Sequence, residues 1–209
     1  MFELMVSMRS TSSYTGNPID NKDYRCNTSI ILKFKETNES ECEYKNIIID
    51  VGKTFRESII RWFPKYDIRT IDAAAILTHY HADAIFGLDE MRCLQEGSPE
   101  PLNVYLTNEC KEVVSQVFYY LFPKYLEKLT VCRPVSNIRW IEINDLIPFT
   151  ACGLQVVPLP GNIPHTVIIT SRTHHIPSHT SRPSSSDAWR GSGVSGLYVW
   201  TTRVGVLHL

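Results

Sequence analysis

The 209 residues are enough for one domain, with or without an extra tail, and for a real hydrophobic core. Hydrophobic residues make up 43% of the chain and charged residues 21%, which is ordinary for a soluble globular protein. Lys plus Arg is 21 and Asp plus Glu is 22, so the net charge is close to zero. Such a charge does not attract nucleic acid or an anionic membrane. Nucleic acid is therefore not favoured as a partner, although a local basic patch stays open.

The spacing of the cysteines and the length of the apolar runs bear on the cellular compartment of the protein. Six cysteines are scattered without a C-x-x-C pair, a pattern typical of reduced, mostly buried cysteines in an intracellular protein. Disulfides are the alternative, and the spacing disfavours a structural zinc knuckle. Residues 1–13 lack the long apolar core of a signal peptide, and the chain has no run of about 18 apolar residues. We expect a cytoplasmic protein without a membrane partner.

Two strands are predicted in the first quarter of the chain. Residues 27–35 are rich in β-forming residues, and the polar, charged residues 36–45 are typical of a hairpin-like connection. Residues 46–51 form the second strand, too apolar on both faces to lie at a solvated surface. Asp50 and Gly52 end it.

A helix and a buried strand follow. Thr54 and Glu57 have the spacing of a capping box, and Pro64 stops the helix. Its apolar residues recur at helical intervals: Phe55, Ile59, Trp62 and Phe63. Residues 73–78 are predicted to form a short buried strand, after which the regular pattern breaks.

Strands and helices continue to alternate as far as residue 160. A helix is predicted at 87–92, then strands at 104–106, 139–143 and 154–158. Between the first two of these strands, a helix begins at Asn108 and has one apolar face, made of Cys110, Val113, Val114, Val117, Phe118 and Leu121. This alternation predicts a layered α/β domain.

The chain changes character after Pro160. Residues 171–196 are rich in Ser, Thr, Arg, His and Pro and have almost no periodic apolar pattern. Such a stretch cannot bury enough surface to offset its ordering entropy. We expect this stretch to be loosely packed. In limited proteolysis it should be cut earlier than the segment formed by residues 24–160.

The sequence THYHAD, residues 78–83, is the strongest functional signal. His79, His81 and Asp83 directly follow a predicted buried strand, and a loop leaving a strand end can aim all three side chains at one point. Imidazole nitrogen and carboxylate oxygen bind zinc at about 2.0–2.2 Å, and the same set accepts manganese or iron. We expect a divalent metal, zinc or manganese, with the metal-facing atoms within about 5 Å of one another. The alternative is one exposed histidine, one core histidine and a helix-capping aspartate.

The motif and its surroundings resemble the metallo-β-lactamase superfamily. The likeness rests on the strand 47–50 with Gly52 and on AILTHYHADAIFGLDEMR, residues 75–92. Segments YRCNTS (24–29) and GKTFR (52–56) are similar to the subgroup around the phosphoribosyl cyclic phosphate phosphodiesterase, which is related to tRNase Z.

The resemblance implies an α/β, metallo-β-lactamase-like αββα sandwich, incomplete at both ends. Its core would span residues 24–160, between a poorly defined segment 1–23 and a low-complexity or divergent tail 161–209.

The resemblance also implies roles for single residues. His79 and His81 would bind the first of two metals. Asp83 would bind the second and act as the catalytic residue that positions or deprotonates the attacking water. Asp50 would orient the ligand loop by hydrogen bonds, the alternative being a strand-end turn residue.

Two departures from the superfamily lie at the front of the chain. The full motif has a histidine after the aspartate, where this chain has Ala84. The H-x-H-A-D-A form is nevertheless typical of the subgroup. Residues 1–23 offer no good version of the family's first strand and its Gly/Thr/Ser-rich turn.

A third departure lies beyond residues 158–160, where the family has a histidine, a metal-bridging aspartate and a terminal histidine. His165 stands near the third-ligand position, a few residues late, and His179 faintly resembles the terminal histidine. Asp187 is the only aspartate after Asp145, and its setting does not resemble the bridging position. The alternative for most of these histidines is a compositional accident of the tail.

Two functions follow. The first is a metal-dependent hydrolase that cleaves a small phosphodiester with a metal-activated water, since two metals about 3.5–4 Å apart polarise water and phosphoryl oxygens. The fold alone does not select the substrate. The alternative is a truncated or non-catalytic member without a complete metal site, because no bridging aspartate can be identified. The incomplete site predicts weak or absent turnover by this chain, and a homodimer stays open as its assembly.

Overall fold

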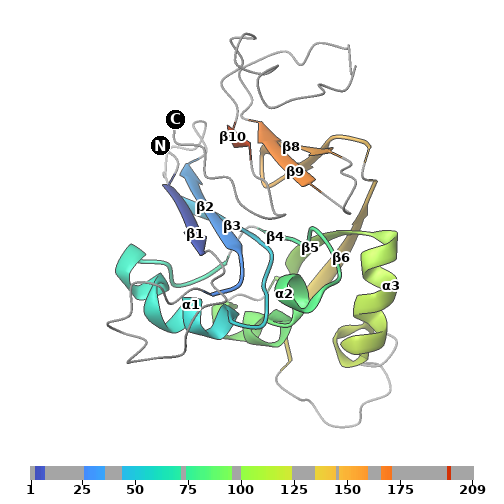
Figure 1. The fold of residues 1–209 in the computed structure, drawn as a ribbon, viewed down its shortest axis with the longest axis horizontal. Helices are drawn as coiled ribbons and strands as arrows, with labels where there is room; N and C mark the ends of the chain where they lie inside the picture. Colours follow the sequence, from blue (N-terminus) through green and yellow to red (C-terminus); the bar gives the residue numbers. More distant parts are fainter. Residues whose placement is uncertain are drawn as a thin grey trace. The chain divides into compact units, whose positions relative to one another are not determined.

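The computed structural model describes residues 3–7, 26–35, 44–71, 74–95, 100–123, 135–144, 146–159, 166–170 and 197–198. The chain divides into two compact units, Met1–Asp145 and Leu146–Leu209, each with its own sheet (Figure 1). None of the helices in these ranges combines the length and apolar character that a membrane span needs.

The first unit is built on a six-stranded sheet in the order β1-β2-β3-β4-β5-β6. Its strands are β1 (Glu3–Ser7), β2 (Ser29–Lys35), β3 (Tyr44–Ile49), β4 (Ala74–Ile76), β5 (Leu102–Thr107) and β6 (Ile138–Ile143). The pairs β1–β2 and β2–β3 are antiparallel, and the pairs from β3 to β6 are parallel. Residues 1–23 were expected to offer no good version of the family's first strand, whereas the structure places β1 there, paired with β2.

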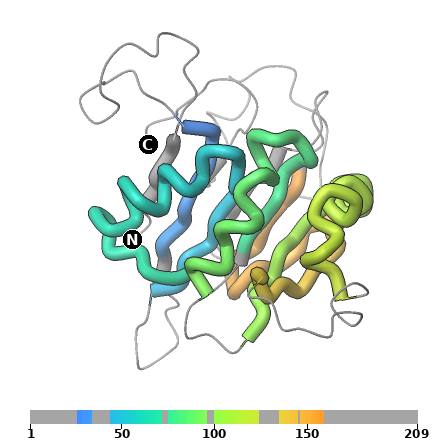
Figure 2. Tube along the Cα trace, turned by 90° about the horizontal axis from the view of Figure 1, so that it is seen from below, coloured from blue at the N-terminus to red at the C-terminus, as the bar shows by residue number. Residues whose placement is uncertain are grey.

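Helices join the parallel strands, because parallel neighbours need a crossover connection. They are α1 (Phe55–Arg61) and the 3₁₀ helix η1 (Phe63–Tyr66), then α2 (Ala82–Ile85) and η2 (Leu88–Leu94), then α3 (Asn108–Val117) and η3 (Tyr119–Leu121). Figure 2 shows the longer of these helices lying over one face of the sheet. The predicted alternation of strands and helices is confirmed.

The hydrophobic core of this unit lies between the sheet and these helices. Ile48, Ala75 and Val104 are neighbours across β3, β4 and β5 and are completely buried. The helices, with Phe118 between α3 and η3, contribute buried residues to the same cluster: Phe55, Phe63, Ala84, Ile85, Leu88, Met91, Leu94, Cys110, Val114, Phe118 and Leu121. The adjacent Ile47 and Ile49 on β3 are buried too. Both faces of this strand are therefore covered, as its continuous apolar run predicts.

The structure corrects three local predictions. Thr54 makes no side-chain capping bond to α1, because its hydroxyl bonds to Asn27 instead. Trp62, predicted on the apolar face of this helix, is 37% exposed. The predicted helix at 87–92 is the 3₁₀ helix η2.

The second unit has a four-stranded antiparallel sheet in the order β10-β9-β8-β7. Its strands are β7 (Phe149–Ala151), β8 (Leu154–Leu159), β9 (Thr166–Thr170) and β10 (Leu197–Tyr198). Cys152 and Gly153 connect β7 to β8 with φ values of 50° and 89°. Two positive φ values suit the two-residue hairpin turn whose twist matches the strands. The predicted strand 154–158 corresponds to β8, and residues 171–196 lie outside the described ranges.

Candidate metal centre

The motif residues converge where β4 ends. The ligand atoms of His79, His81 and Asp83 all lie within 4.8 Å of one another, inside the distance that the spacing predicts. Asp83 does not lie on the loop itself but in the first turn of α2, which begins directly after His81. A strand end, a short loop and one helical turn therefore suffice to bring two nitrogens and one oxygen together.

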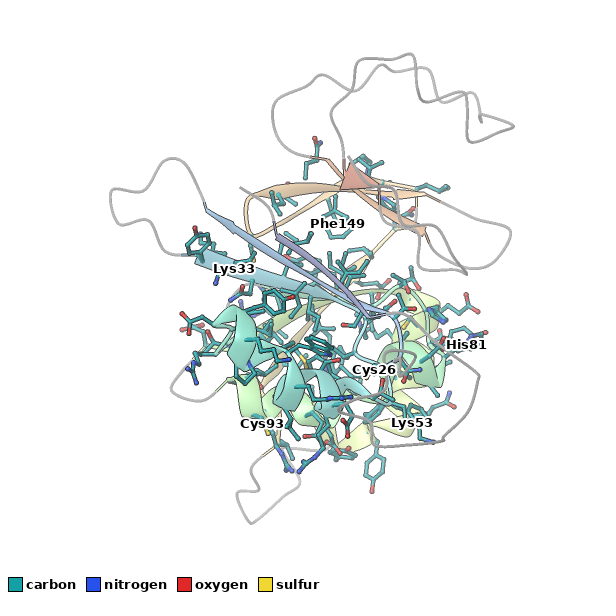
Figure 3. All side chains as sticks on the ribbon, turned by 60° about the vertical axis from the view of Figure 1, so that its left-hand side comes forward. Cys26, Lys33, Lys53, His81, Cys93 and Phe149 are labelled. Carbon is teal, nitrogen blue, oxygen red and sulfur yellow. The ribbon has the colours of Figure 1, made fainter. Side chains whose placement is uncertain are left out.

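The three side chains differ in exposure. The His79 side chain is 12% exposed, whereas that of Asp83 is 50% exposed and His81 lies at the surface (Figure 3). Nε2 of His79 lies 3.5 Å from Oδ1 of Asp83. The two imidazole rings stand 4.9 Å apart and nearly perpendicular. One side of the cluster thus packs into the protein and the other is open to water and to small solutes.

A buried hydrogen-bond chain holds His79. Oδ1 of Asp50 accepts the Thr78 backbone N–H at 2.8 Å, and Oδ2 accepts the Thr78 hydroxyl at 2.7 Å. The same hydroxyl oxygen lies 2.9 Å from Nδ1 of His79. Because the hydroxyl gives its hydrogen to the Asp50 carboxylate, its oxygen accepts from Nδ1–H. Nε2 then carries the lone pair, and it lies 3.5 Å from Oδ1 of Asp83.

Asp50 has the orienting contacts that the resemblance implies, and it is also the strand-end turn residue of the alternative. It follows β3 with a φ of 58°, donates its N–H to the Ile76 carbonyl and accepts the Ser29 hydroxyl at its own carbonyl. Burial raises the pKa of the Asp50 carboxyl from 3.8 to about 7, although the two bonds from Thr78 lower it. The negative charge of Asp83 raises the pKa further.

Thr78 is a site residue that the sequence reasoning missed. It begins the THYHAD motif, but the sequence pattern assigns no role to its hydroxyl, although a hydroxyl directly before the first histidine is a signal that could identify one. Thr78 is 1% exposed and links the Asp50 carboxylate to the imidazole of His79. Groups that bond to a ligand's second nitrogen commonly set the ligand's tautomer and orientation.

The turn after β3 packs against the backbone of α2. Val51 donates its N–H to the Ala84 carbonyl at 2.7 Å, and Gly87 donates to the Val51 carbonyl at 2.6 Å. A Cβ atom at Gly52 would lie 2.0 Å from the backbone oxygen of Asp83, so no side chain fits there. Glycine at position 52 therefore lets the turn lie directly against the residue that carries the carboxylate.

The donor set fits a divalent metal. Imidazole nitrogen suits zinc and the other transition metals, and a carboxylate oxygen extends the range to manganese. The exposed side of the cluster leaves room for water or substrate as further ligands. The fourth predicted ligand, His165, lies outside the described residues, as do His179 and Asp187. The ligand roles, and the catalytic role of Asp83, remain predictions.

Comparisons with known proteins identify relatives of this chain. A family model described as a beta-lactamase superfamily domain matches residues 45–182. No match was found among curated proteins.

Solved structures resemble the chain at low identity. A diphosphatase of the PhnP family is 19% identical with a TM-score of 0.57, over 81% of this chain and 63% of the other. The long form of RNase Z from yeast is 15% identical with a TM-score of 0.52, over 81% and 27%. The chain thus spans less than two thirds of these relatives' length. These likenesses confirm the expected metallo-β-lactamase-like fold class.

Proposed function

Since the chain belongs to the β-lactamase superfamily of metal-dependent hydrolases, we propose that it cleaves a phosphodiester in a small substrate with a metal-activated water. The observation that carries the proposal is the convergence of the ligand atoms of His79, His81 and Asp83 within 4.8 Å after a buried strand, with His81 and Asp83 exposed. Zinc or manganese is the metal that this donor set suits.

The choice of a phosphoester rests on the solved relatives. One similar structure is a diphosphatase and another is an RNase, so both proteins are named for cleaving bonds to phosphorus. The sequence likeness to the cyclic phosphate phosphodiesterase subgroup favours the same class. The fold by itself supports many reactions, which is why the substrate needs this separate argument.

Each described residue has a distinct part in the proposed mechanism. His79 and His81 would hold the ion through imidazole nitrogens, and Asp83 through a carboxylate oxygen. When bound, a divalent metal supplies Lewis acidity toward water and phosphoryl oxygen. The half-exposed Asp83 carboxylate can position the attacking water and accept its proton. Asp50 and Thr78 keep the imidazole of His79 in one orientation.

A second candidate is a non-catalytic member of the superfamily. One observation favours it. Within the described ranges, His79, His81 and Asp83 form the one group of three or more side chains that could hold a metal ion. The family that the sequence resembles has an aspartate that bridges the two metals, and its expected position beyond residue 160 lies outside the described residues. A chain with only the front half of the site would bind one ion and turn substrate over weakly.

Metal content and turnover together test both candidates. We expect purified protein to retain zinc or manganese, His81→Ala to lose it, and His174→Ala to keep it, because ligand bonds carry the affinity. Bis(p-nitrophenyl) phosphate turnover should disappear in Asp83→Ala and persist in Glu112→Ala, a change at an exposed carboxylate on α3. Metal binding without turnover would support the non-catalytic candidate. Equal metal content in the His81 and His174 variants would reject the site.

A further inference from the structure

Lys53 lies next to the cluster formed by His79, His81 and Asp83, although these residues are distant from Lys53 in the sequence. It is exposed in the turn between β3 and α1, and its backbone N–H donates to the Ala82 carbonyl at 3.1 Å. Ala82 stands between His81 and Asp83. Figure 3 shows Lys53 and His81 on the same side of the molecule. A long, flexible lysine side chain starting at this position can reach the open side of the cluster.

The backbone on either side of Lys53 is held in place. On one side, Gly52 lies so close to the Asp83 carbonyl that no Cβ fits between them. On the other side, Thr54 donates its N–H to Oδ1 of Asn27 at 2.9 Å, and its hydroxyl accepts the Asn27 N–H at 2.6 Å. The base of the lysine side chain is therefore positioned relative to Asp83 by contacts from two directions.

The ammonium group of Lys53 is not used elsewhere in the described structure. Arg56, Arg69, Lys111 and Arg139 form ion pairs, Lys33 and Lys65 lie over aromatic rings, and Lys45, Arg61 and Arg92 have other contacts. Among the basic side chains whose placement is described, Lys53 alone makes no ion pair, hydrogen bond or ring contact. Its three N–H donors are free to bind a ligand.

We propose that Lys53 binds a charged phosphoryl oxygen of the substrate and thereby selects an anionic phosphodiester over a neutral ester. This inference rests on the proposed function and deepens it. A diester carries one negative charge beside the Asp83 carboxylate, and Lys53 is the described cation placed to offset that repulsion. Lysine binds phosphate as a point charge through charge-assisted hydrogen bonds.

The test compares Lys53→Met with Lys53→Arg, and with Lys65→Met as a control of equal net charge. Charge-assisted hydrogen bonds are stronger than neutral ones, and solvent at the exposed position of Lys53 reduces their effect. Lys53→Met should therefore raise the KM for bis(p-nitrophenyl) phosphate about tenfold, with kcat changed less than about twofold. Lys53→Arg should restore the KM, and Lys65→Met should leave it unchanged.

Three further readouts separate this role from a structural one. The KM for the neutral ester p-nitrophenyl acetate should be the same in all variants, and so should the bound metal. The tenfold difference should shrink at about 0.5 M salt, because exposed charges are screened. An unchanged diester KM in Lys53→Met, or an equal rise for the neutral ester, would overturn the proposal.

A binding measurement keeps the inference separate from the proposed function. If the wild-type chain shows no turnover, the phosphodiesterase proposal fails. The Lys53 proposal is then tested by calorimetric titration of the metal-loaded protein with inorganic phosphate. An approximately tenfold weaker Kd in Lys53→Met than in Lys65→Met would still support Lys53 as the phosphate-binding cation. Equal Kd values, or no phosphate binding by the wild type, would overturn it.

Discussion

Replacing Thr78 with Val removes the hydroxyl that joins Asp50 to His79 while keeping the size and branching of the side chain. Two contacts disappear, the 2.7 Å bond to Oδ2 of Asp50 and the 2.9 Å contact with Nδ1 of His79. The backbone bond from Thr78 to Oδ1 of Asp50 remains. The substitution therefore tests the linkage itself and not the packing around it.

The size of the effect follows from the burial of Asp50. Asp50 is 3% exposed. In Thr78→Val, Oδ2 of Asp50 would lose the hydroxyl donor, and little water can reach it as a replacement. Leaving a buried acceptor without its partner costs about 1–3 kcal/mol, and more when the acceptor is charged. Loss of a residue that orients a ligand typically weakens metal binding about 10- to 100-fold.

The pH dependence of this cost has a defined sign. Burial raises the pKa of Asp50 in the folded protein to about 7, above its ordinary value of 3.8. The folded state therefore binds more protons than the unfolded state between these values, and the free energy of unfolding falls as pH rises through them. Because the lost hydroxyl had lowered this pKa, Thr78→Val should be penalised more at pH 8 than at pH 5.

Urea unfolding of the metal-free protein at both pH values measures the stability, and calorimetric zinc titration measures the affinity. Thr78→Ser, which keeps the hydroxyl, is the matched control. If Thr78→Val and Thr78→Ser had the same free energy of unfolding at pH 8 and the same zinc affinity, the proposed linkage would be refuted.

Two further predictions concern the packing of the first unit. Gly52→Ala places a Cβ 2.0 Å from the Asp83 carbonyl oxygen. We therefore expect the free energy of unfolding to fall by about 1–3 kcal/mol and the Tm in a thermal melt to fall by about 5 °C. An unchanged Tm would mean that the turn does not lie against α2. Cys93 is exposed, whereas burial, with smaller effects from Asp50 and Glu109, raises the pKa of the Cys110 thiol to about 12. A thiol reagent should therefore modify Cys93 in the native protein and Cys110 only after unfolding, and rapid native labelling of Cys110 would contradict this burial.

Features that depend on neighbours along the chain could be predicted from the sequence. The apolar run before Asp50 predicts a strand buried on both faces, and the spacing of Cys110 and Val114 predicts one face of a helix. The order His79, His81, Asp83 after a strand end predicts three converging ligands, because few residues separate them and the chain has little freedom between them. His165 as a further ligand stays a prediction of the same sequence.

Contacts between distant parts of the chain were decided only by the tertiary structure. Asp50 and Thr78 are 28 positions apart and meet because β3 and β4 lie side by side and end at the same edge of the sheet. The expected capping role of Thr54 is replaced by bonds to Asn27, 27 positions away. Lys53 lies beside Ala82 for the same reason. A local pattern cannot encode such pairings, because they depend on strand order and register, which the packing of the whole sheet determines.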